Sequence, residues 1–421
     1  MDTDSAAFIV TAVFLAALAA QVGLTLWLGR RHVAHILAHR DRVPAEFAER
    51  ITAADHRKAA DYTVARTRLM MVQSLADAGV LLLFTLGGGL DRLDGLLRGL
   101  VSTELARGAL FIATVVLLLS LVELPFSLYR TFVIDARFGF NRTTPGLFLT
   151  DLLRTTVVML VLGLPLVLAV LWLMQAAGRF WWLAAWAVWM LFNVLMLALW
   201  PALIAPLFNR FTPLPEGELK ARIEALLARC GFEPQGLFVM DGSRRSTHGN
   251  AYFTGFGRTR RIVFYDTLLA KLTPEEVEAV LAHELGHFKR RHVVKRMLWL
   301  AGLSLVGLMV LALLLELPAF YTGLGASQPS AYMALTLFML VGPVFTFLLQ
   351  PLLSFYSRRH EFEADAFAAR HASAAALIRA LTKLYQDNAA TLTPDPLYST
   401  FYDSHPPVAL RIGRLKTAPV A

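Results

Sequence analysis

Seven long apolar runs constrain the fold of this chain more than any other feature. Each has few or no charged side chains and approaches or exceeds the roughly 20 helical residues that cross a bilayer. The composition agrees, with 56% hydrophobic and 17% charged residues and a mean hydropathy of +0.54. The runs predict an all-α polytopic membrane protein of about seven transmembrane helices. They occupy residues 6–28, 69–89, 109–128, 155–174, 181–207, 297–315 and 331–353.

Two of these runs have an alternative interpretation. Asp77 lies inside the run 69–89, and Glu123 lies near the end of the run 109–128. A charge in the bilayer is costly, so either run could instead be a buried helix of a soluble region.

The distribution of Lys and Arg predicts an orientation. Residues 29–68 carry nine of them and residues 130–154 carry four, whereas the amino terminus and residues 316–330 carry none. Basic loops remain in the cytosol, so we expect the amino terminus outside and the carboxyl terminus inside. The amino terminus is acidic, which favours a permanent first anchor over a cleaved signal peptide. The net charge of +9 then reflects basic loops facing anionic lipid, without a nucleic-acid partner.

This orientation divides the chain into four predicted regions. Residues 1–207 hold five transmembrane helices, 208–296 form a cytosolic insert, 297–353 hold two further helices, and 354–421 form a cytosolic carboxyl-terminal part. Within the insert, the sequence predicts a helix at 216–230, a strand at 236–241, and two strands, beginning at Gly249 and Arg261, joined across 257–260. We therefore expect a small α/β unit on the cytosolic side.

The insert ends in the motif His283-Glu284-Leu285-Gly286-His287. Thr273 and Glu276 with Pro274 between them predict a capped helix start. Positions i and i+4 share one helix face, so both imidazoles can reach one metal ion while Glu284 projects nearby. Chance spacing and a purely structural metal site are the alternatives.

A catalytic zinc needs a third protein ligand, which the segment after the last apolar run can supply. Glu361 and Asp365 lie one helical turn apart. We assign Glu361 to the metal and Asp365 to the ring N–H of a ligand histidine. His360 is a competing third ligand, and Glu363 is interpreted as a surface residue. The single cysteine, Cys230, excludes a cysteine-based zinc site.

The chain resembles the type 1 CAAX prenyl protease family of integral-membrane zinc metalloproteases. Beyond the two metal motifs, the resemblance spans nearly the whole chain in family order. Its segments are YRTFVIDARFGFNRTT at 129–144, APLFNRFTPLPEG at 205–217, NAYFTGFG at 250–257, HELGH at 283–287, EFEAD at 361–365 and SHPP at 404–407.

The resemblance implies a zinc endopeptidase whose helices enclose an intramembrane chamber, with one Zn²⁺ per chain near its cytosolic end. His283, His287 and Glu361 would bind the metal, and Glu284 would activate a water molecule. His405 and Arg411 would stabilise the oxyanion. Asn250, Ala251 and Tyr252 would hold the substrate backbone. From the residues alone, His405 could equally be a turn residue and Arg411 a solvated helix charge.

The sequence constrains the identity of the substrate and of the host membrane less than it constrains the metal site. The expected partners are membrane lipid and a peptide or protein, either a lipidated CAAX-type substrate or another membrane-associated chain. The Ala-, Leu- and Arg-rich composition suggests a bacterial homologue in the inner membrane, or the endoplasmic reticulum membrane in a eukaryote. The alternatives are a quality-control protease, a catalytically silent zinc-bound scaffold, and a transporter. The transporter hypothesis rests on the polar residues in or beside the runs: Asp77, Glu123, Asp151, Arg154 and Asn193.

Overall fold

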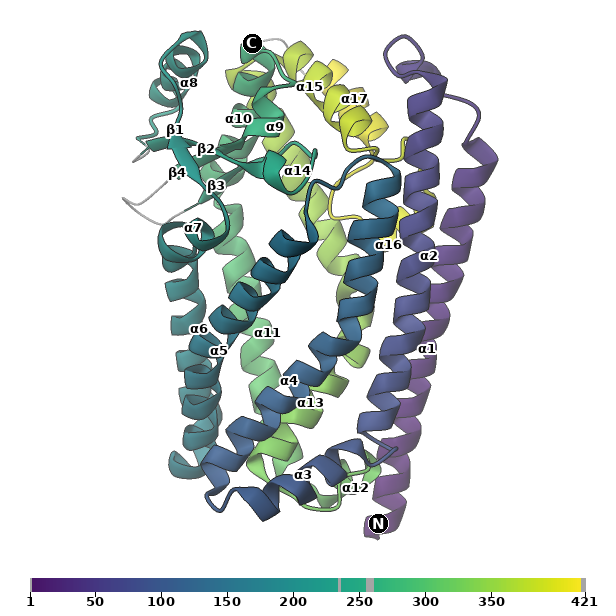
Figure 1. Ribbon diagram of the computed structural model, residues 1–421, viewed down its shortest axis with the longest axis vertical. Helices are drawn as coiled ribbons and strands as arrows, with labels where there is room; N and C mark the ends of the chain where they lie inside the picture. The colour runs from purple at the N-terminus through teal and green to yellow at the C-terminus, as the bar shows by residue number, and fades with distance from the viewer. Residues whose placement is uncertain (1, 234–235, 255–260, 418–421) are drawn as a thin grey trace.

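The computed structural model describes residues 2–233, 236–254 and 261–417, and its long helices stand side by side below a small mixed unit (Figure 1). In the described residues, seven helical stretches are long and apolar enough to cross a membrane, which confirms the predicted number. They are Thr3–His39, Ala53–Phe84, Glu104–Asp135, Pro145–Ala176, Gly178–Phe208, His292–Leu315 and Ala331–His371.

The helices within and between these stretches are numbered in chain order. They are α1 (Thr3–His39), α2 (Ala53–Phe84), α3 (Gly89–Leu100), α4 (Glu104–Tyr129), α5 (Pro145–Ala176), α6 (Trp181–Leu199), α7 (Ala205–Phe208), α8 (Glu218–Arg229), α9 (Asp266–Leu269), α10 (Pro274–Lys289), α11 (His292–Leu315), α12 (Pro318–Gly323), α13 (Ala331–Thr346), α14 (Gln350–His371), α15 (Ala374–Asp387), α16 (Pro396–Tyr402) and α17 (Val408–Lys416).

The two runs with an alternative interpretation form α2 and α4, and both belong to the seven stretches. Val72 and Leu75 of α2 are more than half exposed, as is Leu121 of α4. Large apolar side chains on the outside of long helices are typical of lipid contact and not of a soluble core. Glu123 accepts a hydrogen bond from Gln73, so its carboxylate has a polar partner on α2.

The insert contains a four-stranded sheet of β1 (Phe211–Pro213), β2 (Gly236–Met240), β3 (Ala251–Thr254) and β4 (Arg261–Tyr265). The strand order is β1-β2-β4-β3, with β3 and β4 antiparallel, as predicted. The connection proposed at 257–260 lies outside the described residues. The sequence prediction missed β1, which has only three residues, and the parallel pairing of β2 with β4.

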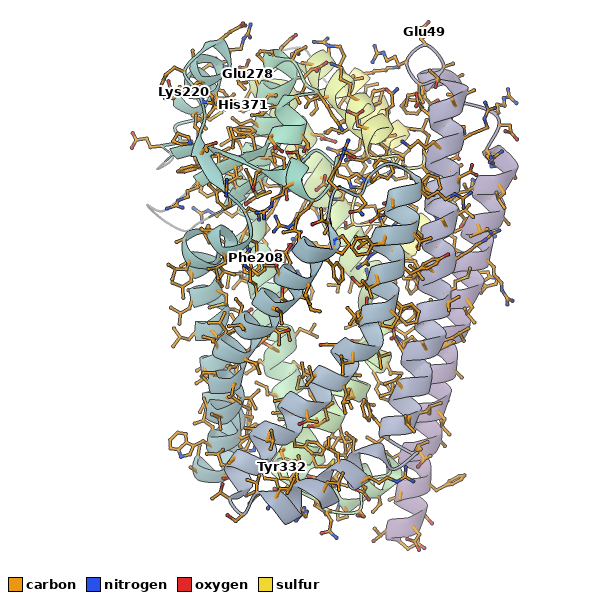
Figure 2. All side chains as sticks on the ribbon, in the orientation of Figure 1. Glu49, Phe208, Lys220, Glu278, Tyr332 and His371 are labelled. Carbon is orange, nitrogen blue, oxygen red and sulfur yellow. The ribbon has the colours of Figure 1, made fainter. Side chains whose placement is uncertain are left out.

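The two ends of the molecule have separate cores. One packs α8, α10, α15 and the sheet around side chains such as Leu226, Phe264 and Leu281. The other lies at the opposite end, around Phe14 and Tyr332. Figure 2 shows Tyr332 at the end far from Lys220, Glu278 and His371. The amino terminus, α3 and α12 also lie at that far end (Figure 1).

Helix α10 begins as its sequence predicts, and it packs closely against α14. Thr273 and Glu276 exchange the two hydrogen bonds of a capping box. Gly286 lies against α14, where an added Cβ would come within 2.8 Å of the Ala364 Cα atom. The glycine between the histidines therefore lets the two helices approach closely, and this brings the metal-binding motif against the helix that carries Glu361.

Candidate metal centre

Three of the predicted ligands meet at one point between α10 and α14. The Nε2 atoms of His283 and His287 are 3.2 Å apart. The carboxylate of Glu361 lies 3.5 Å from the first through Oε2 and 3.2 Å from the second through Oε1. His283 and Glu361 are buried, and His287 is partly buried. No other group of three such side chains in the described residues has ligand atoms this close.

These separations fit a tetrahedral metal ion. Ligand atoms about 2.0–2.1 Å from Zn²⁺ at tetrahedral angles would lie roughly 3.3 Å from one another. The Oε2 atom of Glu361 is also buried, and no donor in the described residues points at it in hydrogen-bond geometry, although Nδ1 of His405 lies 2.8 Å away. A cation at this point would balance the charge of the buried carboxylate. The donor set of two imidazoles and one carboxylate leaves room for a further ligand.

Asp365 contacts the first histidine of the motif. Its Oδ1 atom lies 2.9 Å from Nδ1 of His283, so this nitrogen donates and Nε2 keeps a free lone pair. Arg411 of α17 donates two hydrogen bonds to Asp365, from Nε to Oδ2 at 2.9 Å and from Nη2 to Oδ1 at 2.6 Å. Arg411 is only 5% exposed, so the interpretation as a solvated helix charge is wrong.

The carboxylates beside His283 favour a positive charge on its imidazole ring. Burial lowers the pKa of His283, but hydrogen bonds to Asp365 and Glu361 outweigh it and raise this pKa to about 9. Without a metal the imidazole therefore carries a proton, and metal binding must displace it. Loss of contact with water raises the pKa of the Glu284 carboxyl, while His283 and His287 partly offset that effect. Such a shift brings a carboxylate closer to the pKa of a general base.

The second histidine has a support that the sequence analysis missed. Nδ1 of His287 lies 2.9 Å from Nδ1 of His292, and Nε2 of His292 lies 3.1 Å from the Glu363 carboxylate. If His287 offers Nε2 to a metal, its Nδ1–H donates to His292, whose Nε2–H then donates to Glu363. Glu363 keeps a partly exposed position, with 29% of its side chain accessible, but it also has a partner in His292 that its interpretation as a surface residue did not include. His360, the competing ligand, instead stacks on His292 with ring centroids 3.8 Å apart.

Only the three-dimensional structure reveals that His292 contacts His287. It follows Arg291, whose φ of 56° turns the chain between α10 and α11 and returns His292 to His287. The one signal in the sequence is a third histidine five residues after the motif.

We expect His292→Ala to weaken zinc binding by about 10–100-fold, the usual cost of losing the partner that orients a ligand. The measurement is zinc affinity by competition with a chelator. His371→Ala is the matched control, since within the described residues the His371 ring contacts only Phe367 of its own helix, by a hydrogen bond to the carbonyl and by stacking. Equal zinc affinity in His292→Ala and the unmodified protein would contradict this role.

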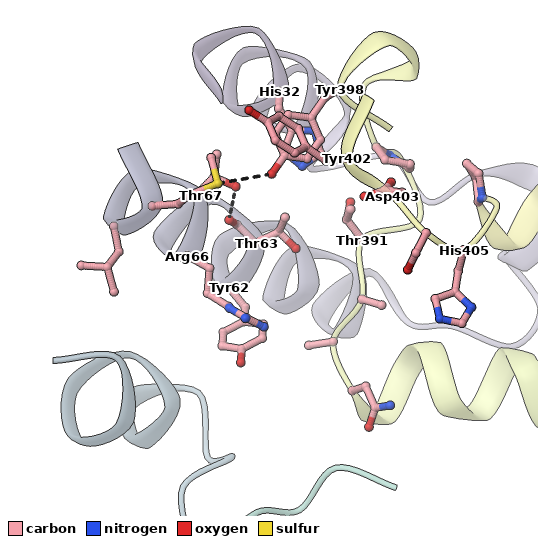
Figure 3. A pocket seen from close by; sticks show the side chains of 18 of the residues that line it. His32, Tyr62, Thr63, Arg66, Thr67, Thr391, Tyr398, Tyr402, Asp403 and His405 are labelled. Carbon is pink, nitrogen blue, oxygen red and sulfur yellow. Dashed lines mark hydrogen bonds between the residues drawn. The ribbon is translucent and has the colours of Figure 1, made fainter. Parts of the chain in front are cut away.

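His405 reaches the site from the loop after α16. Its Nδ1 atom lies 2.8 Å from Oε2 of Glu361, and its side chain is 62% exposed. It also lines a cavity of about 620 Å³. Figure 3 shows His405 on one side of this cavity, with Tyr62 and Arg66 of α2 on another. The structure thus places His405 between the candidate metal site and a hollow large enough for several residues of a peptide.

The predicted substrate-binding segment lies at the edge of the sheet. Ala251 and Tyr252 belong to β3, which ends the strand order and packs against α10. Asn250 precedes this strand, and its side chain accepts a hydrogen bond from the amide of Ala251. The outer edge of a terminal strand offers backbone N–H and C=O groups to an added strand. The structure therefore brings Asn250, Ala251 and Tyr252 beside the helix that carries the metal motif.

Most polar residues that motivated a transporter have partners. Asp151 binds Arg245 of the insert through two hydrogen bonds of 2.7 and 2.9 Å, and Arg154 lies 3.9 Å from the same carboxylate. Asn193 donates to the Trp189 carbonyl of its own helix. The Asp151 pair joins α5 to the insert, and the other two contacts lie within one helix, as expected of paired residues and not of a transport path.

Comparison with known proteins agrees with this architecture. The family profile described as "CAAX prenyl protease N-terminal, five membrane helices" matches residues 32–210, and "Peptidase family M48" matches residues 213–418. The chain is 38% identical to the CAAX prenyl protease 1 homolog of Arabidopsis thaliana, over 72% of each protein. It is 34% identical to the human CAAX prenyl protease 1 homolog, over 75% of this chain and 74% of that protein.

The fold agrees as well. The crystal structure of S. mikatae Ste24p superposes with a TM-score of 0.89 at 29% identity, covering 96% of this chain and 98% of that one. The converging histidines and carboxylate therefore lie in a fold that a solved relative shares along almost its whole length. From these matches and the geometry above, the chain belongs to the CAAX prenyl protease 1 family of M48 peptidases, which are multi-pass membrane metalloproteases that cleave peptide or protein substrates.

Proposed function

We propose that this protein is a zinc endopeptidase with one Zn²⁺ held by His283, His287 and Glu361. The observation that carries the proposal is the convergence of these three ligands with Glu284 one residue from the first. A silent metal-bound scaffold would have no use for a carboxylate placed in the site with a raised pKa. Asp365 and His292 are proposed to orient the two imidazoles.

Each step of the proposed reaction is assigned to particular residues of the chain. Zinc, when bound, supplies a Lewis acid that lowers the pKa of water toward about 7. Glu284 takes the proton as that water attacks the peptide carbonyl, and later returns it to the leaving amine. His405 and the Nη1 group of Arg411 donate to the developing oxyanion. Arg411 Nη1 lies 3.5 Å from Glu361 and is the guanidinium nitrogen that does not bind Asp365.

Asn250, Ala251 and Tyr252 are proposed to hold the substrate backbone. A peptide that adds to the outer edge of β3 would run beside α10 and place its scissile bond near the zinc ligands. The 620 Å³ cavity beyond His405 would take the residues on one side of that bond, as part of an intramembrane chamber. The predicted region boundaries at 207–208, 296–297 and 353–354 would then separate the transmembrane helices from the two regions that hold the catalytic and metal-binding residues.

The proposed substrates carry a CAAX-type carboxyl terminus with or without a prenyl group, because the relatives are named CAAX prenyl proteases. The test is incubation of the purified protein with a farnesylated CAAX peptide and its unprenylated twin. We expect hydrolysis that a zinc chelator stops and added zinc restores. If neither peptide is cleaved under conditions where zinc is bound, the proposed substrate class is wrong.

The proposed orientation, with the metal site in the cytosol, can be tested by labelling. Cysteines replacing Ser102 and Ser327 should react with an impermeant maleimide added to intact cells, because both residues are exposed at the end that carries α3 and α12. Cysteines replacing Glu49, exposed at the metal end in Figure 2, and Ser243, exposed beside Asp266 of the insert, should react only after permeabilisation. All four are made in a Cys230→Ala background. Reaction at Ser243 from outside would place the active site on the extracytoplasmic side.

A further inference from the structure

A second hollow, of about 410 Å³, lies outside the metal centre where α10, α14 and α17 meet. Five arginines and one glutamate line it, which makes it strongly cationic. The arginines are Arg290 at the end of α10, Arg358, Arg359 and Arg370 of α14, and Arg414 of α17. Apart from Glu363, which accepts from His292, no residue that lines this arginine pocket takes part in the proposed peptidase mechanism.

The arginine pocket has one anionic side chain against five cationic ones. Glu363 is its single carboxylate, and it already contacts His292, Lys295 and Arg359. Within the described residues, no carboxylate oxygen lies within 4.0 Å of the guanidinium groups of Arg290, Arg370 or Arg414. Arg370 donates to a carbonyl of its own helix, and Arg414 lies over the Phe362 ring at 3.6 Å. A concave site with several unpaired guanidinium groups suits a phosphate.

The same helix connects the arginine pocket to an apolar stripe. Leu348, Leu352 and Phe355 precede Arg359 and Phe362 at helical spacing, so these residues share one face of the chain around α14. The first three are 63%, 55% and 62% exposed. Side chains of this kind at the end of a membrane-spanning stretch face acyl chains.

The aromatic residues place the pocket at the membrane surface. Trp299 of α11 and Tyr356 of α14 contact each other with ring centroids 6.0 Å apart, and Trp299 is 53% exposed. Trp and Tyr gather where hydrocarbon meets headgroups. Tyr356 follows Phe355, the last residue of the apolar stripe, and the first pocket arginines of α14 are Arg358 and Arg359. The aromatic pair therefore lies where the apolar stripe meets the arginine pocket. The pocket therefore lies where lipid headgroups would be.

From these observations we propose that the arginine pocket binds the phosphate headgroup of an anionic phospholipid, with its acyl chains along Leu348, Leu352 and Phe355. Basic pockets beside transmembrane helices on the cytosolic side suit such headgroups. The bound lipid would join the carboxyl-terminal ends of α10, α14 and α17. Arg290 comes three residues after His287, and Arg414 three residues after Arg411, so the lipid would also brace the elements that carry the metal site.

The test measures lipid retention by the full chain in neutral detergent. The protein receives equal amounts of phosphatidylglycerol and phosphatidylcholine, and native mass spectrometry counts the lipids that stay bound. We expect the unmodified protein to retain the anionic lipid preferentially. Arg290→Gln with Arg414→Gln should lower its affinity by roughly 30-fold, because each arginine contributes about 1 kcal/mol toward anionic lipid.

The matched control replaces Arg30 and Arg68 with Gln. Both are exposed arginines of α1 and α2 that lie outside the arginine pocket. The control should retain the lipid as the unmodified protein does. Arg290→Lys with Arg414→Lys keeps the charge and should retain most of the affinity, and unchanged zinc content in every variant shows that each is folded. Equal loss in the control, or equal retention of both lipids by the unmodified protein, would overturn the proposal.

A last experiment tests whether the ligand of the arginine pocket is a lipid or a soluble phosphate. Glycerol 3-phosphate and inorganic phosphate at millimolar concentration should leave the retained phosphatidylglycerol in place, because neither offers an acyl chain to the apolar stripe. Displacement of the lipid by either one would assign the pocket to a soluble phosphate and reject the lipid. Because binding is measured without substrate, it can succeed or fail independently of peptidase activity.

Discussion

Glu284→Gln should abolish most peptide hydrolysis while the protein keeps its zinc. Gln has the shape of Glu but cannot take a proton from water, so kcat/KM should fall by roughly 10²–10⁴-fold, the usual contribution of a general base. The three ligand atoms belong to other residues, so metal content should stay near one zinc per chain. The measurements are cleavage of the CAAX peptide and zinc content by elemental analysis.

Glu278→Gln is the matched control for this prediction. Glu278 lies on the same helix, but its carboxylate faces Arg222 and Arg229 of α8, away from the metal ligands. This variant should keep nearly all of the activity. Hydrolysis by Glu284→Gln at the unmodified rate, with zinc bound, would remove Glu284 from the mechanism.

Glu361→Ala should release the metal. The substitution leaves two imidazoles as the only protein ligands of the proposed site, so zinc affinity should fall by more than about 100-fold. Asp365→Ala removes only the partner of His283, and we expect a loss of about 10–100-fold. His360→Ala should keep the metal, because His360 stacks on His292 and is not among the converging ligands.

The order of the three affinities is the decisive result, measured by titration against a chelator of known strength. Loss of zinc from His360→Ala with retention by Glu361→Ala would contradict the ligand assignment. The melting temperature of each variant without metal separates a direct loss of the ligand from a general loss of folding, since the buried carboxylate also contacts His405 and Arg411.

The prediction of the helical shell succeeded because its signal is local. Each membrane-spanning stretch must be about 20 apolar residues long, and this property can be counted along the chain without knowing the fold. The start of α10 was predictable for the same reason, since Thr273, Pro274 and Glu276 form their capping interactions within one turn. The His283 and His287 pairing likewise follows from the repeat of a single helix.

Contacts between distant segments were harder to predict from the sequence. Glu361 and Asp365 were assigned to the site from their spacing, but only the packing of α14 against Gly286 shows that they reach the two histidines. The contact of Glu363 with His292 was missed because its position was inferred from one helix considered alone, although the side chain is 29% exposed. Its partner, His292, comes from a helix 71 residues earlier in the chain.

Local patterns in the sequence were enough to predict the seven membrane-spanning stretches, the capped helix with its two histidines, and the residue types that converge with them. These depend on hydrophobicity, helix periodicity and capping, which act over a few turns of the chain. The tertiary structure decided which carboxylates meet which imidazoles, that Arg411 is buried against Asp365, and that His292 supports His287. It also brought the arginines of α10, α14 and α17 around one hollow. These arrangements result from packing between segments far apart in sequence, and no local pattern encodes the angle and register at which two helices meet.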